Sequence, residues 1–217
     1  AHVLEQVVAR TPIRHVAIAA LGDRLGFRGS IVNFVVRHVK KMVPAWEIPG
    51  AGSFTRALAS GSRQEFSPVI VGHDDIAFLQ YTSGSTGNPK GVMLTHANLL
   101  ANLRAMQRAS GITSADTFVS WLPLYHDMGL IGACMGSLYV GFRLVLMSPL
   151  AFLARPVRWL QTIHRHRATV SAAPNFAYEL CASKLDERDL DGLDLSCWRL
   201  AYNGAEPVSP DTLEHFV

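Results

Sequence analysis

Ten residues from Thr82 to Gly91, with the sequence TSGSTGNPKG, combine features that suit the binding of an oxyanion. The segment holds three glycines, four hydroxyl side chains and Lys90. Glycine allows backbone N–H groups to approach and wrap an anion. Hydroxyl groups rotate to donate to phosphate oxygens, and lysine adds a mobile positive charge. We interpret the segment as a polyphosphate-binding loop; the alternative is a surface turn.

The spacing within this loop differs from that of a Walker A motif. Gly84 and Gly87 are separated by two residues, and Lys90 is followed by Gly91. A Walker A loop needs four intervening residues and then Lys-Ser/Thr. The next helix is expected to begin near His96, too late to place a phosphate at its N-terminus. Kinase-like phosphoryl transfer is also disfavoured, because the chain has no DFG or HRD signature.

Alternating strand and helix patterns predict an α/β fold with a largely parallel sheet. The expected strands cover residues 15–20, 75–81, 117–122, 143–147, 168–172 and 199–202. The expected helices cover residues 31–43, 54–59, 96–110, 129–139, 156–164, 176–184 and 210–217. Thr95 and Ser209 are expected to cap two of these helices. Residues 75–81 (DIAFLQY) lack alternation, which predicts a central strand buried on both faces.

Four loops are therefore candidates for a binding site, because ligands bind beyond the carboxyl ends of parallel strands. They follow Tyr81, Leu122, Ala172 and Tyr202, and the last three carry the sequences WLPLYHDMG, AAPNFAY and NGAEP.

Composition narrows the functional classes. The net charge of +3 over 217 residues is too small to indicate nucleic acid. Cys134, Cys181 and Cys197 form no CxxC pair, so a metal or disulfide framework is not expected, and buried thiols in a reducing, cytoplasmic compartment are. The most apolar stretch, 128–147, contains glycines and Arg143, which favours a buried helix and strand over a membrane span.

The expected helix at 31–43 is amphipathic. Its polar face carries Arg37, His38, Lys40 and Lys41, with Phe34 among them. An ordinary solvated face is one interpretation. The other is a surface for an acidic partner or for peripheral membrane contact.

The loop YTSGSTGNPKG resembles the phosphate-binding signature of the adenylate-forming superfamily, which includes acyl-CoA synthetases and fatty acyl-AMP ligases. The resemblance implies part of the large N-terminal domain of such an enzyme. Residues 1–74 would form a partial N-terminal subdomain and connector, and residues 75–217 an AMP-binding core without the C-terminal lid domain.

The resemblance also implies roles for individual residues. Phosphate contacts would come from Thr82, Ser83, Gly84, Ser85, Thr86, Gly87 and Lys90, and adenine contacts from Asn203, Gly204, Ala205, Glu206 and Pro207. The acyl pocket would include His126, Asp127, Asn175, Phe176 and Tyr178, although plain core packing is the alternative for Phe176 and Tyr178. Lys90 and His126 would be catalytic, with His126 orienting the carboxylate; no metal ligand is expected within these residues.

The implied reaction consumes ATP with Mg²⁺, converts a fatty acid to acyl-AMP and transfers the acyl group to a thiol. Residues 1–80, notably VNFVVRHVKKMVP, resemble long-chain fatty acyl-CoA synthetases, and the remainder resembles fatty acyl-AMP ligases. The main interpretation is a long-chain fatty acid–CoA ligase. The alternatives are an acyl-AMP ligase that delivers to the phosphopantetheine of an acyl carrier protein, and a non-catalytic nucleotide-binding module.

Several of the family's motifs, among them the Mg²⁺-binding Glu and the adenylation lysine, are expected beyond Val217. We therefore expect the 217-residue chain by itself to turn over slowly or not at all.

Overall fold

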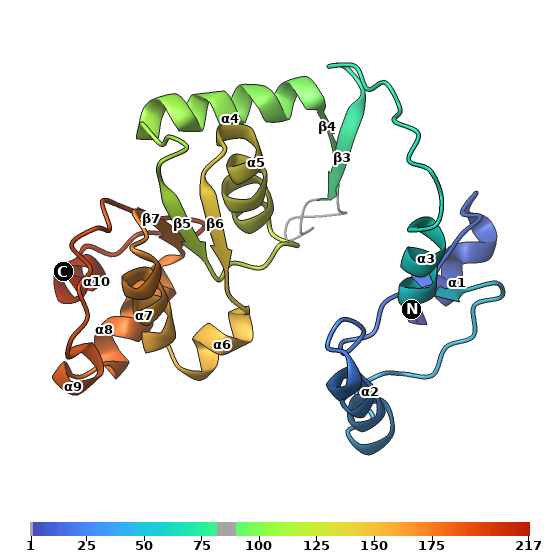
Figure 1. Cartoon of the computed structure of the whole chain (residues 1–217), viewed down its shortest axis with the longest axis horizontal. Coiled ribbons are helices and arrows are strands. Elements are labelled where there is room, and N and C mark those ends of the chain that lie inside the picture. Colours follow the sequence, from blue (N-terminus) through green and yellow to red (C-terminus); the bar gives the residue numbers. More distant parts are fainter. Residues whose placement is uncertain (1, 82–89) are drawn as a thin grey trace. The chain divides into compact units, whose positions relative to one another are not determined.

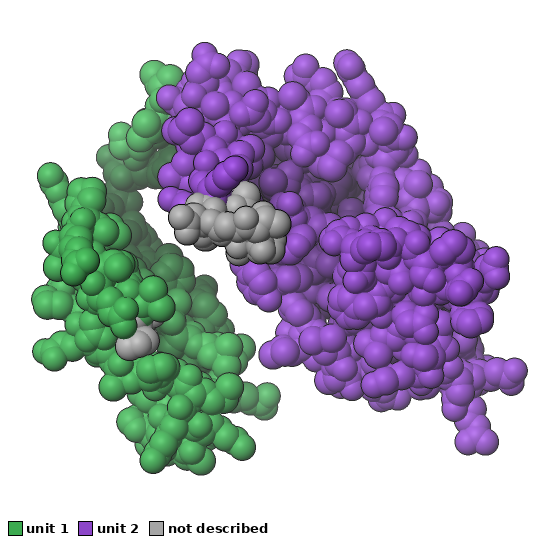
Figure 2. Space-filling view, turned by 180° about the vertical axis from the view of Figure 1, so that it is seen from behind, with its two compact units in different colours: residues 1–70 green, residues 71–217 purple. Residues whose placement is uncertain are grey.

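The structure is a computed structural model that describes residues 2–81 and 90–217 (Figure 1). Its contacts divide the chain into two units, residues 1–70 and 71–217, which Figure 2 shows in separate colours. Each unit is described by itself.

Unit 1 is built around a short parallel pair of strands. β1 (Ala17–Ile18) pairs with β2 (Gly52–Ser53), so the strand expected at 15–20 is reduced to two residues. The helical elements are α1 (His2–Val7), η1 (Val8–Arg10), α2 (Phe27–Phe34), η2 (Val35–Val39) and α3 (Phe54–Gly61).

The helix expected at 31–43 is displaced toward the N-terminus. α2 begins at Phe27, and its continuation as a π-helix ends at Val39. Lys41 adopts a left-handed conformation with φ 49°, which an α-helix does not continue through. The chain therefore leaves the helix before Pro44, and Met42 and Val43 lie outside it.

Unit 2 contains the predicted parallel sheet. β5 (Thr117–Ser120), β6 (Arg143–Leu146), β7 (Val170–Ala173) and β8 (Leu200–Asn203) are all parallel, in the order β6-β5-β7-β8. Because side chains alternate along a strand, Phe118, Ala172 and Tyr202 face one side of the sheet, and Val119 and Ser171 face the other.

The prediction for residues 75–81 was wrong. β3 (Ile76–Tyr81) is not part of the parallel sheet; it pairs antiparallel with β4 (Gly91–Thr95), from Ile76 opposite Thr95 to Tyr81 opposite Gly91. The strand is exposed rather than buried, with Ile76 at 53% and Leu79 at 60%. The chain returns at once as a second strand, and this local partner takes up the hydrogen bonds that a central strand would make to non-local neighbours.

The helices of unit 2 largely follow the expected pattern. They are α4 (His96–Ser110), η3 (Met128–Met135), α5 (Gly136–Val140), α6 (Pro149–Ala154), α7 (Val157–His166), α8 (Asn175–Lys184), α9 (Glu187–Leu190) and α10 (Pro210–Phe216). Thr95 caps α4 in a capping box with Asn98, and Ser209 accepts from the backbone N–H of Thr212 at the start of α10. Both cap predictions are confirmed; α6 and α9 were not predicted.

Helices cover both faces of the sheet (Figure 1). α4, η3 and α5 contact one another over the Phe118 and Ala172 face. On the other face Trp159 of α7 donates its indole N–H to Ser171 at 2.8 Å, and the two residues are fully buried. In the described ranges no helix has the length and apolar character needed to cross a bilayer.

The cysteines of the described ranges are free thiols. Cys181 is buried among the apolar side chains, and this burial raises the pKa of its thiol to about 12. Cys134 and Cys197 are partly exposed. The predicted burial of the thiols is therefore confirmed for Cys181 and not for the other two.

A polar cluster fastens the amino ends of three strands. Asp116, which precedes β5, accepts hydrogen bonds from Thr169 before β7 (2.7 Å) and from Arg199 before β8 (2.8 Å). The backbone N–H of Thr113 also donates to it at 2.8 Å. Burial alone would raise the pKa of Asp116, but the hydrogen bonds from Arg199, Thr169 and Thr113 outweigh it and lower the pKa to about 2.

We expect Asp116→Asn to lower the free energy of unfolding of unit 2 by about 2 kcal/mol at neutral pH. The carboxylate's pKa is depressed in the folded state, so its contribution is full above the unfolded pKa near 4 and is lost as the pH falls toward about 2. Urea unfolding of both proteins across this pH range measures the effect. Asp191→Asn, which changes an exposed carboxylate, is the control. A difference in unfolding free energy between Asp116→Asn and the parent that stays the same near pH 2 would contradict the lowered pKa of Asp116.

Candidate functional site

The carboxyl ends of β5, β7 and β8 lie at one edge of the parallel sheet. Three of the four candidate loops therefore meet at this edge, as the sequence predicted. The fourth loop follows β3, which belongs to the antiparallel pair. Its position therefore does not follow from the direction of the parallel strands. Its residues Thr82, Ser83, Gly84, Ser85, Thr86 and Gly87 lie outside the described residues; Lys90 is described and directly precedes β4.

The NGAEP turn is fastened to the first turn of α8. Asn175 accepts at its Oδ1 from Asn203 Nδ2 at 3.1 Å and from the backbone N–H of Ser209 at 3.0 Å. Glu206 Oε1 accepts from the backbone N–H of Phe176 at 2.6 Å. An acceptor carboxylate at a helix N-terminus is favourable, because the first N–H groups lack partners within the helix. These bonds fix the position of the turn relative to the sheet.

Two features of this turn are unusual for a purely structural loop. Ala205 adopts φ 69°, a left-handed conformation that costs a non-glycine residue about 1–2 kcal/mol. Asn203 Oδ1 is buried and accepts no hydrogen bond from the described part of the chain. A buried acceptor without a donor is unfavourable, so this atom adds a further local cost to the turn.

The residues 121–129 form a tight loop with an exposed tip. His126 and Asp127 have about half of their side chains exposed, at 51% and 58%, and His126 Nδ1 lies 2.8 Å from Asp127 Oδ1. Asp127 also accepts from the backbone N–H of Met128 at 2.8 Å and so caps η3. Gly129 is required here, since a Cβ at this position would lie 2.5 Å from the carbonyl oxygen of Pro123. The side chain of His126 is therefore about half exposed at the tip of a loop that is closely packed at Gly129.

The three residues expected in the acyl pocket from AAPNFAY have different surroundings. Tyr178 is 1% exposed within the core, and its hydroxyl donates to the carbonyl of Tyr202 at 2.7 Å. Phe176 is 43% exposed and its ring lies edge-on to Trp121 at 6.1 Å. Asn175 holds the NGAEP turn. Asn175 therefore fixes the position of the turn and Tyr178 packs in the core, whereas Phe176 remains partly exposed.

A cavity of about 500 Å³ lies on the α4 and α5 face of the sheet, beside the NGAEP turn. Its walls are almost entirely apolar and come from α4, η3, α5 and three strands. The lining residues include Met106, Phe118, Gly132, Phe142, Ala172 and Gly204. Asn203 and Gly204 bring the turn to the cavity's wall, so a ligand could place an apolar group in the cavity and a polar group at the turn.

The cavity was not predicted from the sequence. The sequence feature that could have indicated the cavity is the pair Gly132 and Gly136, two small residues one helical turn apart in an otherwise apolar helix. An added Cβ at Gly132 meets no heavy atom within 4 Å, whereas one at Gly136 would contact the Phe142 ring at 3.5 Å. The absence of side chains at these positions leaves room between the helix and the sheet.

The described residues contain no group of three or more His, Cys, Asp or Glu side chains able to hold a metal ion. The described part of the edge therefore offers a polar turn beside an apolar cavity.

Known proteins resemble this chain over most of its length. A medium-chain-fatty-acid–[acyl-carrier-protein] ligase of Teredinibacter turnerae is 49% identical over 66% of the chain and 22% of the relative. A putative fatty-acid–CoA ligase of Mycobacterium tuberculosis is 39% identical over 87% of the chain and 33% of the relative. The crystal structure of a fatty acyl-adenylate ligase from L. pneumophila, in complex with acyl adenylate and pyrophosphate, matches with a TM-score of 0.75 and 39% identity, covering 98% of this chain and 34% of that one.

The chain thus spans between about a fifth and a third of the length of these relatives. The sequence family described as AMP-binding enzyme matches residues 4–217. On this match, and on the resemblance of the loop at residues 81–91, the chain belongs to the AMP-binding enzyme family of adenylate-forming ligases.

Proposed function

We propose that this chain supplies the adenine and acyl subsites of an enzyme that activates a fatty acid with ATP to form an acyl-adenylate. The observation that carries the proposal is the contact between an apolar cavity of about 500 Å³ and the NGAEP turn. The cavity suits an aliphatic chain, and Asn203 and Gly204 bring the polar groups of the turn to its wall. Both relatives named above are fatty acid ligases, which supports the same substrate class.

In this reaction a carboxylate oxygen of the fatty acid attacks the α-phosphorus of ATP, and the bond to pyrophosphate breaks. The carboxylate is already ionised at neutral pH, so no general base is needed for attack. Holding the two reactants in line is worth up to about 7–11 kcal/mol of the barrier. Lys90 would balance charge on the phosphates, and His126 would orient the carboxylate at the sheet edge. Mg²⁺ bound to ATP would neutralise phosphate charge.

The experiment that tests this proposal compares ligands that fill one subsite with a ligand that fills both. Isothermal titration of the 217-residue chain with ATP, with a fatty acid, and with a non-hydrolysable acyl-adenylate analogue would measure the three affinities. An acyl-activating site should bind the analogue at least about 100-fold more tightly than ATP. Equal affinities for ATP and the analogue would instead identify a nucleotide-binding module without an acyl subsite.

A second measurement addresses Lys90. We expect Lys90→Ala to weaken ATP binding about 10–100-fold, because a hydrogen bond to a charged group is worth about 1.5–3 kcal/mol. The fold should be retained, since Lys90 is exposed and lies in no helix or strand. Lys184→Ala, which removes an exposed lysine from the end of α8, is the matched control. Unchanged titration of the Lys90 variant would remove this residue from the phosphate site.

For the thiol acceptor we propose coenzyme A first, with an acyl carrier protein as the alternative. One relative is described as a fatty-acid–CoA ligase and another as a ligase that acts on an acyl carrier protein. Coenzyme A and a phosphopantetheinylated carrier protein should be titrated separately against the chain loaded with the acyl-adenylate analogue. Tighter binding of the carrier protein would favour the alternative.

A further inference from the structure

Unit 1 exposes a group of large apolar side chains on and around α2, which we call the α2 surface. Phe27 is 84% exposed, and Phe34 and Ile31 are 60% and 53% exposed. Leu21 and Met42, from the segments on either side of the helices, are 74% and 71% exposed. Large apolar side chains gathered on one face of a soluble protein are often part of an interaction site.

The apolar side chains of α2 form one outward stripe. Phe27, Ile31 and Phe34 follow the i, i+4, i+7 spacing that places residues on the same face of an α-helix. The ring of Phe34 lies 5.0 Å from that of His38, which extends the stripe into η2. The stripe normally faces a core, and here it faces away from its own unit.

The opposite face of α2 is fixed against unit 1, so the helix has no freedom to rotate the stripe inward. Gly29 packs so closely on Gly22 that an added Cβ would lie 1.9 Å from the Gly22 carbonyl oxygen. Asn33 Oδ1 accepts from the backbone N–H of Gly22 at 2.7 Å, and Asn33 Nδ2 donates to Asp23 at 3.2 Å. The outward direction of Phe27, Ile31 and Phe34 is therefore set by these contacts.

The residues around the stripe are strongly basic. Between Leu21 and Val43 the sequence contains five Lys or Arg residues and a single acidic residue, Asp23. The basic residues are Arg24, Arg28, Arg37, Lys40 and Lys41. Asp23 is already engaged, since it accepts from the backbone N–H of Ala20 at 2.8 Å and from Asn33. The α2 surface therefore combines a net positive charge with protruding apolar groups.

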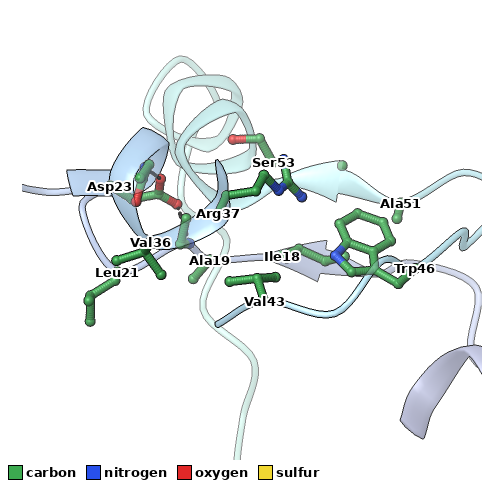
Figure 3. Close-up of a pocket in the computed structure, with 13 residues that line it drawn as sticks. Ile18, Ala19, Leu21, Asp23, Val36, Arg37, Val43, Trp46, Ala51 and Ser53 are labelled. Carbon is green, nitrogen blue, oxygen red and sulfur yellow. Dashed lines mark hydrogen bonds between the residues drawn. The ribbon is translucent and has the colours of Figure 1, made fainter. Parts of the chain in front are cut away.

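A cavity of about 480 Å³ adjoins this surface (Figure 3). Its lining shares Leu21, Arg37 and Val43 with the segment that carries the stripe, and Trp46 lies at its other side. Asn33 and Val36 also line the cavity, so it lies on the face of the helix directed into unit 1 and leaves the stripe on the other face.

We propose that the α2 surface binds the surface of an anionic phospholipid bilayer, with Phe27, Ile31 and Phe34 entering the headgroup region. An interfacial helix of this kind combines Phe or Leu on one side with Lys and Arg that contact anionic headgroups. A lipid surface accepts protruding apolar side chains without a shaped pocket, whereas an acidic protein partner would need a complementary apolar groove. This inference is independent of the proposed adenylation activity.

Co-sedimentation with vesicles tests the proposal directly. The 217-residue chain should bind vesicles containing phosphatidylglycerol, bind pure phosphatidylcholine vesicles much more weakly, and dissociate in high salt. Lys40→Gln with Lys41→Gln should weaken binding about 25-fold, since each basic residue near an anionic surface changes the partition coefficient about fivefold. Arg10→Gln with Arg14→Gln, the same charge change elsewhere in unit 1, should have a much smaller effect.

The apolar stripe has its own matched pair of variants. Phe27→Ser should weaken vesicle binding at least about tenfold, because one phenylalanine leaves the lipid. Phe66→Ser is the control, since Phe66 is 85% exposed and Phe27 84% exposed, and Phe66 lies outside the α2 surface. Equal losses in both variants, or no vesicle binding at low salt, would overturn the proposal. Self-association that Phe27→Ser abolishes, without vesicle binding, would assign the surface to a second copy instead.

Discussion

Gly132→Phe should abolish the binding of long-chain acyl-adenylate analogues while leaving ATP binding nearly unchanged. Gly132 lines the cavity beside the NGAEP turn, and an added Cβ there meets no heavy atom within 4 Å. The backbone can therefore accept a side chain, and the ring would fill space that an acyl chain needs. Excluding about four methylene groups at about 0.8 kcal/mol each weakens binding more than about 100-fold.

The chain length of the ligand separates a blocked cavity from a damaged fold. An acetyl-adenylate analogue should bind the variant and the parent chain equally, because its methyl group does not reach past the mouth of the cavity. Leu138→Phe provides a matched control on α5, since Leu138 is 75% exposed and does not line the cavity. Equal loss of the acetyl and long-chain analogues would indicate misfolding. Retained binding of the long-chain analogue would show that the acyl chain binds outside this cavity.

The parts of the fold that could be predicted from the sequence are those fixed by local chemistry. Thr95 and Ser209 were identified as caps because a short hydroxyl side chain satisfies an otherwise unpaired helical N–H. Gly111 ends α4 with φ 64°, a conformation that glycine adopts without steric cost. The parallel sheet followed from the alternation of short apolar runs with helical patterns.

The parts that could not be predicted depend on contacts between distant segments. The apolar run at 76–81 suits a buried strand or an exposed hairpin equally, and only its pairing with Gly91–Thr95 decides between them. The cavity joins Met106, Gly132 and Gly204, so its existence depends on how a helix packs over the sheet. For Tyr178 the sequence left both an acyl-pocket role and plain core packing open, and the structure places its side chain in the core.

The sequence predicted where three of the candidate loops lie, and the roles of their side chains stay predictions. The loops after β5, β7 and β8 lie at one edge because parallel strands share a direction. Within NGAEP, the resemblance implies contacts to adenine, which stay a prediction, and the structure adds that Asn203 Oδ1 is buried. Whether one atom is buried depends on how distant segments pack around it, which a linear motif does not specify.

Trp159→Ala should destabilise unit 2 more than any other single change considered for this chain. Trp159 is 0% exposed at the centre of the aromatic core, with ring centroids of Trp198 at 5.3 Å, Tyr178 at 5.4 Å and Phe152 at 5.8 Å. Truncating a buried tryptophan costs about 3–5 kcal/mol, because the transfer free energy is lost and a void remains. A domain's total stability is about 5–15 kcal/mol, so much of it would be lost.

A conservative variant separates packing from hydrogen bonding at this position. Trp159→Phe retains a ring but removes the indole N–H that donates to Ser171 at 2.8 Å. Ser171 still donates to the carbonyl of Val119 at 2.6 Å, so it keeps one partner, and we expect a loss of about 1–3 kcal/mol. Urea unfolding followed by far-UV circular dichroism measures both variants. Trp46→Ala, in unit 1, should leave the unfolding of unit 2 unchanged; a Trp159→Ala loss no larger than that of Trp159→Phe would mean that the aromatic packing contributes little.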